Sequence, residues 1–122
     1  MKKDYKLYLK DIAEAIESIE QFVKGNTFDD FVKDDKTASA VIRKFEIIGE
    51  ATKQIPDEIR QKYPTIPWKE MAGMRDRLIH FYSGVDYKLV WDTIKNRLPQ
   101  VKPLIKKILE NENSVLCHQN LP

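Results

Sequence analysis

Apolar residues recur along residues 5–24 at alternating steps of three and four positions, the spacing that lines one face of a helix. This stripe consists of Leu9, Ile12, Ile16, Ile19 and Val23. The pair Gly25-Asn26 then gives a helix-stop signal. The pattern predicts a first helix with one buried face. A short acidic connector follows it and carries Phe28, Phe31 and Val32.

A second helical stripe begins after this connector, where Thr37 is a suitable N-cap residue. Its apolar positions are Val41, Ile42, Phe45, Ile48 and Ile55. Gly49 lies among them and would let a neighbouring helix approach closely. Beyond this stripe, residues 57–63 predict a short helix that Pro64 and Pro67 end.

A further helix is predicted to begin near Trp68 and to stop around Ser83-Gly84. Asp86 can then cap a last long helix. The apolar side of that helix consists of Leu89, Val90, Ile94, Leu98, Val101, Ile105 and Ile108. Its two prolines, Pro99 and Pro103, are expected to kink or split it.

No segment alternates apolar and polar residues as a half-buried strand would. At 122 residues the chain suits one domain with a real core, and its 42% hydrophobic and 33% charged residues are ordinary for a globular protein. We therefore predict an all-α bundle of about four or five helices over residues 1–113, followed by a flexible C-terminal tail over residues 114–122.

The 21 basic and 19 acidic residues leave a net charge of only +2, so any affinity for RNA must come from local patches. Cys117 is the only cysteine, which excludes an intrachain disulfide and fits a reducing compartment. No apolar run approaches the roughly 20 residues that span a bilayer, and the N-terminus lacks the apolar stretch of a signal peptide. We expect a cytoplasmic protein with no membrane association.

Residues 75–82 combine four chemically distinct side chains within about two helical turns. They are the cation of Arg75, the carboxylate of Asp76, the imidazole of His80 and the phenol of Tyr82. Arginine offers a planar positive fork for phosphate, and histidine has an unperturbed pKa suited to proton transfer near neutral pH. The combination suggests chemistry on a phosphodiester. Each residue also has a plain structural interpretation, as a surface ion pair for Arg75 or as packing at a helix end for His80 and Tyr82.

If residues 75–82 form an ideal helix, Asp76 and His80 lie within about 40°, close enough for the carboxylate to orient the imidazole. Arg75 and Tyr82 nearly eclipse. Ile79 falls between these pairs as an apolar residue on a polar face, which suggests a partner there. Arg75 and His80 diverge by about 140°, so reaching one phosphate requires the arginine to bend round, the helix end to deform, or a second subunit to help. A composite site at a two-fold dimer interface would explain both observations.

No part of the sequence predicts a metal or cofactor site. Cys117-His118 offers two ligands in a predicted tail, too few for a metal site. The chain has no glycine-rich phosphate loop and no array of metal-binding carboxylates. Lysines near both ends could attract a nucleic-acid backbone, although a solvated helix face is the simpler interpretation.

The order Arg75, four residues, His80, one residue, Tyr82, in an all-α chain of this size, resembles the HEPN superfamily. More closely, it resembles the HepT toxins of MntA/HepT toxin–antitoxin systems of type II or type VII. The similarity extends to Ile47–Ala51, Pro67-Trp68, Met71–Arg75, Val85–Tyr87 and Val90-Trp91. One position departs from the pattern, because Asp76 stands where many HepT-like sequences have asparagine. Its carboxylate adds negative charge near the RNA, so we expect a different rate or pH optimum.

This resemblance implies a homodimeric, metal-independent endoribonuclease toxin that needs no cofactor, with a cleft lined by the motif residues of both subunits. Arg75 would bind the phosphate, His80 would act as general acid or base when a ribose 2′-hydroxyl attacks it, and Asp76 would hold the imidazole. An MntA-like nucleotidyltransferase antitoxin would transfer AMP to Tyr82 and so block the site of the RNA phosphate. The implied partners are RNA, a second copy of the chain and the antitoxin.

Two other interpretations stay open at this point. The chain could be a non-catalytic HEPN accessory module that binds a nucleotidyltransferase and its nucleotide or substrate. It could also be a helical dimerisation domain whose polar cluster only supports the interface. The RNA target depends on the shape of the assembled cleft.

Overall fold

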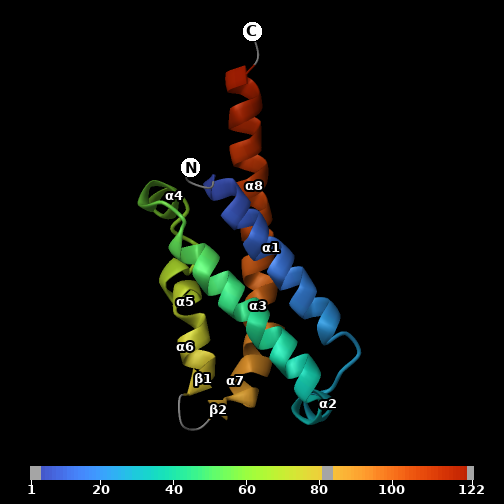
Figure 1. Cartoon of the computed structure of the whole chain (residues 1–122). Helices are drawn as coiled ribbons and strands as arrows, with labels where there is room; N and C mark the ends of the chain where they lie inside the picture. The colour runs from blue at the N-terminus through green and yellow to red at the C-terminus, as the bar shows by residue number, and fades with distance from the viewer. Residues whose placement is uncertain (1–3, 81–83, 121–122) are drawn as a thin grey trace.

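The computed structural model describes residues 4–80 and 84–120, with side chains for residues 4–79 and 84–112. The fold is all-α, as predicted, apart from one pair of two-residue strands (Figure 1). In chain order the elements are α1 (Tyr5–Phe22), α2 (Phe28–Lys33), α3 (Asp35–Lys53), α4 (Asp57–Lys62), α5 (Trp68–Ala72), α6 (Met74–Leu78), β1 (Ile79–His80), β2 (Gly84–Val85), α7 (Tyr87–Asp92), the π-helical turn η1 (Thr93–Arg97) and α8 (Leu98–Asn120).

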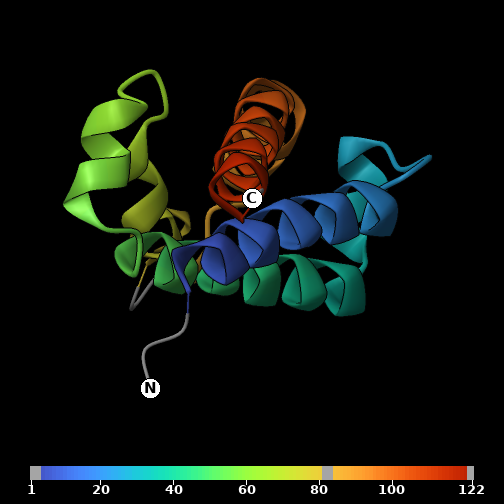
Figure 2. The same ribbon diagram turned by 90° about the horizontal axis from the view of Figure 1, so that it is seen from above.

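Three long helices form the frame of the molecule. α1 and α3 lie side by side, and α8 packs on α1 in a second layer (Figures 1 and 2). The short helices α5 and α6 pack on α3 to one side of α8, whereas α2 lies on the other side (Figure 2). The segment that carries the motif is thus attached to one side of a rigid frame.

The core lies between these layers. All apolar positions predicted for the first two helices are buried, and so are those of the last helix, except Leu89, which is half-buried. Burying one such side chain fully contributes about 1.5–3 kcal/mol relative to leaving it exposed. The largest fully buried side chains are Phe31, Phe45, Leu9, Ile12, Ile16, Ile19, Ile48, Met71, Leu78, Leu98, Ile105 and Ile108.

The start of α3 differs from the prediction. Asp34 is the N-cap, and its carboxylate accepts the Thr37 N–H at 3.1 Å and the Thr37 hydroxyl at 2.6 Å. Thr37 therefore belongs to the first turn of the helix, and aspartate, the better N-cap residue, takes the capping position. The acidic connector before it also forms a helix, α2, because Thr27 and Asp30 make a reciprocal capping box.

The single helix predicted from Trp68 to Ser83-Gly84 is wrong. Gly73 interrupts it after α5, and α6 ends at Leu78. Glycine in a helix interior is less stable than alanine by about 0.5–1 kcal/mol, because it loses more conformational entropy on folding. Ending the helix at Gly73 therefore sacrifices little helical stability. The motif therefore does not lie on one continuous helix.

A short antiparallel strand pair replaces the end of that predicted helix. Ile79 is extended, at φ −122° and ψ 121°, and His80 pairs with Gly84. Gly84 has a φ of 79°, a left-handed conformation that glycine adopts readily. The Asp86 N–H then donates to the Leu78 carbonyl at 2.9 Å. A pair of this length is too short to produce an alternating pattern in the sequence.

The last helical path is continuous but irregular. Asp86 caps α7, as predicted. In η1 the Leu98 N–H donates to the Thr93 carbonyl five residues back, directly before Pro99, which has no N–H to donate. The distortion expected from the prolines is therefore a π turn before Pro99, whereas Pro103 is accommodated inside α8.

Helical backbone extends through most of residues 114–122, since α8 reaches Asn120. The flexibility of this segment in solution stays a prediction. Among the helices that the structure describes, none is both long and apolar enough to cross a membrane.

One buried carboxylate joins α1, α4 and α8. Of these helices, α4 lies toward the end of the molecule away from the strand pair (Figure 1). Glu112 is 5% exposed and accepts hydrogen bonds from the Tyr5 hydroxyl at 2.9 Å, Lys62 Nζ at 3.0 Å and the Tyr63 hydroxyl at 2.8 Å. Nothing in the sequence pattern predicted it, because its partners lie 49 to 107 positions away along the chain.

Candidate functional site

The segment that leads into the motif is held tightly against its neighbours. A Cβ built on Gly49 of α3 would lie only 3.3 Å from the carbonyl oxygen of Ala72. Glycine therefore permits the close approach predicted for a neighbouring helix, and that helix is α5. The buried Trp68 fixes the start of α5, because its indole N–H donates to the Tyr63 carbonyl at 3.0 Å. Both ends of α5 are therefore fixed, and the second end lies about one turn before Arg75.

α6 presents Arg75 and Asp76 to solvent while Met74 and Leu78 bury its other face. The Arg75 side chain is 52% exposed, and its Nη1 lies 3.5 Å from Oδ1 of Asp76, which is 81% exposed. A surface pair of this kind contributes about 0–1 kcal/mol. The guanidinium of Arg75 can therefore exchange this partner for a phosphate at little cost.

Arg75 and Asp76 lie on the wall of an open groove of about 330 Å³ between α3 and the α5–α6 segment. The other lining residues are Arg43, Glu46, Gly49, Glu50, Lys53 and Ala72. Three acidic and three basic side chains line the groove, and two of them, Glu50 and Lys53, pair at 3.3 Å. The groove has no excess of positive charge, so attraction for an anion there depends on individual cations such as Arg75.

The structure changes the geometry predicted for His80. The helix ends at Leu78, so the helical angles of about 40° to Asp76 and about 140° to Arg75 do not apply. Deformation of the helix end, one of the three options, is what brings the backbone of His80 into β1. The side chain of His80 and the whole of Tyr82 lie outside the described residues. Their predicted roles, and the pairing of Asp76 with His80, stay predictions.

Ile79 is not the isolated apolar residue on a polar helix face that the ideal-helix geometry predicted. Because its backbone is extended, the side chain is partly buried and packs against the core. Ile79 therefore no longer supports a dimer, and the dimer itself stays a prediction.

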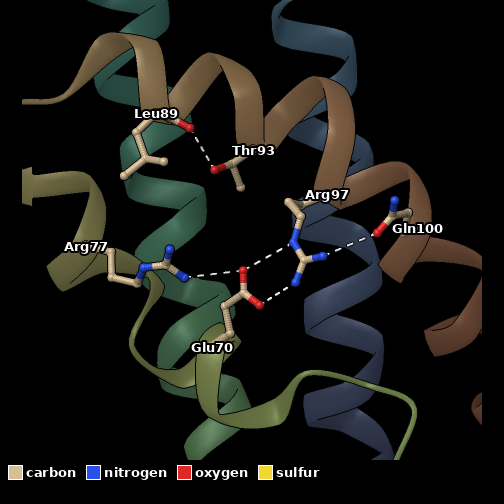
Figure 3. Close-up of polar contacts among 6 residues, drawn as sticks. All are labelled: Glu70, Arg77, Leu89, Thr93, Arg97 and Gln100. Carbon is tan, nitrogen blue, oxygen red and sulfur yellow. Dashed lines mark hydrogen bonds and ion pairs between the residues drawn. The ribbon is translucent and has the colours of Figure 1, made fainter.

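A second polar cluster lies on the other side of α6, and the sequence did not predict it. Glu70 of α5 accepts the Arg97 Nε–H at 3.2 Å and a second N–H from the same guanidinium, and it lies 3.3 Å from Arg77 Nη1 (Figure 3). The hydrogen bonds from Arg97, opposed by partial burial, hold the pKa of Glu70 below its ordinary value. Glu70 and Arg77 are seven positions apart, a spacing that could have signalled their contact. Arg97 is 27 positions away and gave no signal.

This cluster borders a cavity of about 420 Å³ between α6, α7 and η1. Met74, Leu78 and Leu89 give it an apolar lining, and the remaining lining residues are Glu70, Arg77, Asp92, Thr93, Asn96 and Arg97. The Thr93 hydroxyl donates to the Leu89 carbonyl at 2.7 Å (Figure 3). α6 thus separates two hollows, with Arg75 on one side and Arg77 on the other.

No three His, Cys, Asp or Glu side chains gather as metal ligands would within the part of the chain whose side chains are described. Cys117-His118 falls outside that part.

These features define a class of protein: a small all-α domain that carries an Arg-x4-His-x-Tyr segment where a short helix meets a strand pair. The model of the family described as "Ribonuclease HepT-like" matches residues 12–108, which include the whole motif. The chain belongs to this HepT-like ribonuclease family.

Curated relatives agree with this assignment. A protein of Thermococcus cleftensis named "Probable ribonuclease HepT" is 53% identical over 108 residues, which cover 88% of this chain and 98% of that protein. A "Putative RNase" of Methanocaldococcus jannaschii is 46% identical over 119 residues, 93% and 98% of the two chains. Another "Putative RNase", of Caldanaerobacter subterraneus subsp. tengcongensis, is 48% identical over 105 residues, 86% and 94% of the two chains. No solved structure matches the chain significantly.

Proposed function

We propose that this protein is a metal-independent endoribonuclease and the toxin of a toxin–antitoxin pair. The observation that carries the proposal is the position of Arg75, which is exposed beside a groove within a motif that the HepT-like family match includes. Relatives named as ribonucleases support the same activity. Arg75, His80 and Asp76 form the proposed catalytic set.

The proposed reaction uses a hydroxyl of the RNA itself as nucleophile. The ribose 2′-oxygen attacks the adjacent phosphorus, its proton passes to a base, the bond from phosphorus to the 5′-oxygen breaks, and that oxygen takes up a proton. His80 supplies general acid or base catalysis, worth about 10²- to 10⁴-fold. Arg75 binds the phosphate and stabilises its developing charge. The products are a 2′,3′-cyclic phosphate and a 5′-hydroxyl.

A homodimer with a composite cleft is part of the proposal. Large apolar side chains are exposed on α1 and α2, where association of two copies could bury them, and they are Leu7, Phe22, Phe28 and Val32. Analytical ultracentrifugation at micromolar concentration should give twice the 14.3 kDa chain mass. A monomer at that concentration would contradict this part of the proposal.

Tyr82 is the proposed site of neutralisation by the antitoxin. An MntA-like nucleotidyltransferase would transfer AMP to its hydroxyl, and the bulky anion would occupy the place of the RNA phosphate near Arg75. The test is intact-mass analysis of the protein after incubation with such an enzyme and ATP. We expect addition of AMP to the wild type and none to Tyr82→Phe. Equal modification of both proteins would show that another residue is the acceptor.

The direct test of the activity is cleavage of total RNA in EDTA by the wild type beside His80→Ala. We expect the wild type to cut, to resist chelation and to leave cyclic or 3′-phosphate ends, and the variant to be nearly inactive. A folded, unmodified wild type that cuts no RNA would favour the accessory-module interpretation, in which His80→Ala still binds the nucleotidyltransferase.

A further inference from the structure

Glu70 connects three elements through a single carboxylate. Its Oε1 accepts the Arg97 Nε–H and lies close to Arg77 Nη1, while its Oε2 accepts a second N–H of Arg97 (Figure 3). Glu70 belongs to α5, Arg77 to α6 and Arg97 to η1. The Glu70 side chain is 29% exposed, so these contacts are partly shielded from water. The carboxylate thus ties α5 and α6 to the helical path that follows β2.

α6 depends on such contacts because a helix of five residues has little stability of its own. Gly73 directly before it allows a wide range of backbone angles. The buried Met74 and Leu78 fix one side of α6. Arg77 lies two positions after Arg75, about 200° further round the helix, so a contact at Arg77 fixes the rotation that directs Arg75.

The surroundings of α6 agree with this geometry. Arg75 lines the groove toward α3, whereas Arg77 lines the cavity toward α7 and η1. Glu70 therefore acts on the side of α6 that faces away from the proposed phosphate site. A rotation of α6 toward η1 would carry Arg75 away from its groove.

We propose that Glu70 is a positioning residue of the ribonuclease site, which holds Arg77 and Arg97 and thereby fixes α6 and the start of β1. Its effect on catalysis rests on the proposed function, but its effect on α6 does not. Moving a catalytic group by about 1 Å can cost about 10²-fold in rate. A contact that contributes modestly to global stability can therefore be decisive for turnover.

Glu70→Gln tests this, because it keeps the size of the side chain and removes the charge that both arginines contact. We expect kcat for RNA cleavage to fall by about 10- to 100-fold, because Arg75 would no longer lie where charge develops on the phosphate. Arg97→Gln should cause a similar loss, and the double variant should be no worse than Glu70→Gln alone, because Glu70→Gln already removes the contact with Arg97.

Glu20→Gln is the matched control. It breaks the ion pair between Glu20 and Lys102, a partly buried contact of 2.7 Å that joins α1 and α8. This variant should lower the melting temperature about as much as Glu70→Gln and leave kcat unchanged. A wild-type kcat in Glu70→Gln, or a loss of kcat that follows the melting temperature equally in both variants, would overturn the inference.

Hydrogen exchange gives a readout that needs no activity. The Asp86 N–H donates to the Leu78 carbonyl at 2.9 Å and the Arg77 N–H to the Gly73 carbonyl at 3.3 Å. Glu70→Gln should speed exchange at these two amides by about tenfold or more, whereas Glu20→Gln should not. Unchanged exchange in Glu70→Gln would refute positioning. If the wild type cuts no RNA, the proposed function fails, and the exchange result alone decides the role of Glu70.

Discussion

At the residue scale, the proposed chemistry places Arg75 at the RNA phosphate. Its guanidinium is half exposed, its nearest acidic neighbour is the exposed Asp76, and it borders a groove open to solvent. A charged group in this setting loses little solvation when it binds a phosphate, and it adds little to the stability of the fold. A substitution of Arg75 should therefore change activity while leaving the free energy of unfolding almost unchanged.

Arg75→Ala should lower kcat/KM for RNA cleavage by about 10²- to 10³-fold, because a donor aimed at the phosphate is lost. Arg75→Lys should lose less, since lysine keeps the charge but not the planar fork. The free energy of unfolding of both variants should lie within about 0.5 kcal/mol of the wild-type value. Initial rates and denaturant titrations measure these effects, with Lys24→Ala, an exposed cation, as control. Activity of Arg75→Ala within twofold of the wild type would remove Arg75 from the catalytic set.

Asp76→Asn introduces the residue that the resemblance to HepT toxins led us to expect at this position. We expect the variant to stay active but to show a shifted pH–rate profile, because it removes the negative charge proposed to lie beside the imidazole of His80. Asp76→Ala should lose about tenfold in rate, since the polar contact is removed as well. Profiles of the three proteins that coincide would mean that Asp76 does not act on His80.

At the element scale, the long helices were predictable and the short ones around the motif were not. The apolar stripe from Leu9 to Val23 repeats over about four turns and is buried as expected, which is why the bounds of α1 could be predicted closely. The break at Gly73 and the pairing of β1 with β2 involve single residues and contacts made only after folding. The same holds for the contact of Glu70 with Arg97, which the sequence places far apart.

Gly49→Val tests whether the close packing of α5 on α3 is needed for stability and activity. Its Cβ would meet the Ala72 carbonyl oxygen at 3.3 Å and the Met71 carbonyl oxygen at 3.7 Å. We expect the free energy of unfolding to fall by about 1–3 kcal/mol, and the folded variant to cut RNA more slowly because α5 and α6 must move. Calorimetry and cleavage rates measure this.

Ser39→Val is the control for Gly49→Val, because it places the same β-branched residue at an exposed position of α3. It should lower the free energy of unfolding only by the small difference in helix propensity between serine and valine. If the two variants melt at the same temperature, the close approach at Gly49 is not important for stability.

At the scale of the whole molecule, Glu112 joins α1, α4 and α8. Burial alone would raise the pKa of this carboxyl, but the hydrogen bonds from Tyr63, Lys62 and Tyr5 outweigh it and lower the pKa. Burial and the bond to Glu112 in turn raise the pKa of Tyr5 to about 12. The network is therefore most stable between these limits, with Glu112 ionised and Tyr5 neutral.

Stability should fall in acid because of this network. A carboxyl whose folded pKa lies below its ordinary value of 4.5 stabilises the fold above that pH and loses this contribution as pH falls through the folded pKa. Glu112→Gln should lower the free energy of unfolding by about 1–3 kcal/mol at neutral pH. From about pH 5 to pH 3, its melting temperature should fall less than that of the wild type. Glu110→Gln, exposed in the same helix, is the control. Parallel pH curves for Glu112→Gln and the wild type would contradict this role.

The central claim is that the motif cuts RNA with the substrate's own 2′-hydroxyl. The most direct test compares an RNA oligonucleotide that the wild type cuts with a DNA oligonucleotide of the same sequence, both in EDTA. We predict that only the RNA is cut, that its product ends in a 2′,3′-cyclic phosphate, and that His80→Ala cuts neither. Cleavage of the DNA, or RNA cleavage that persists in His80→Ala, would contradict the account.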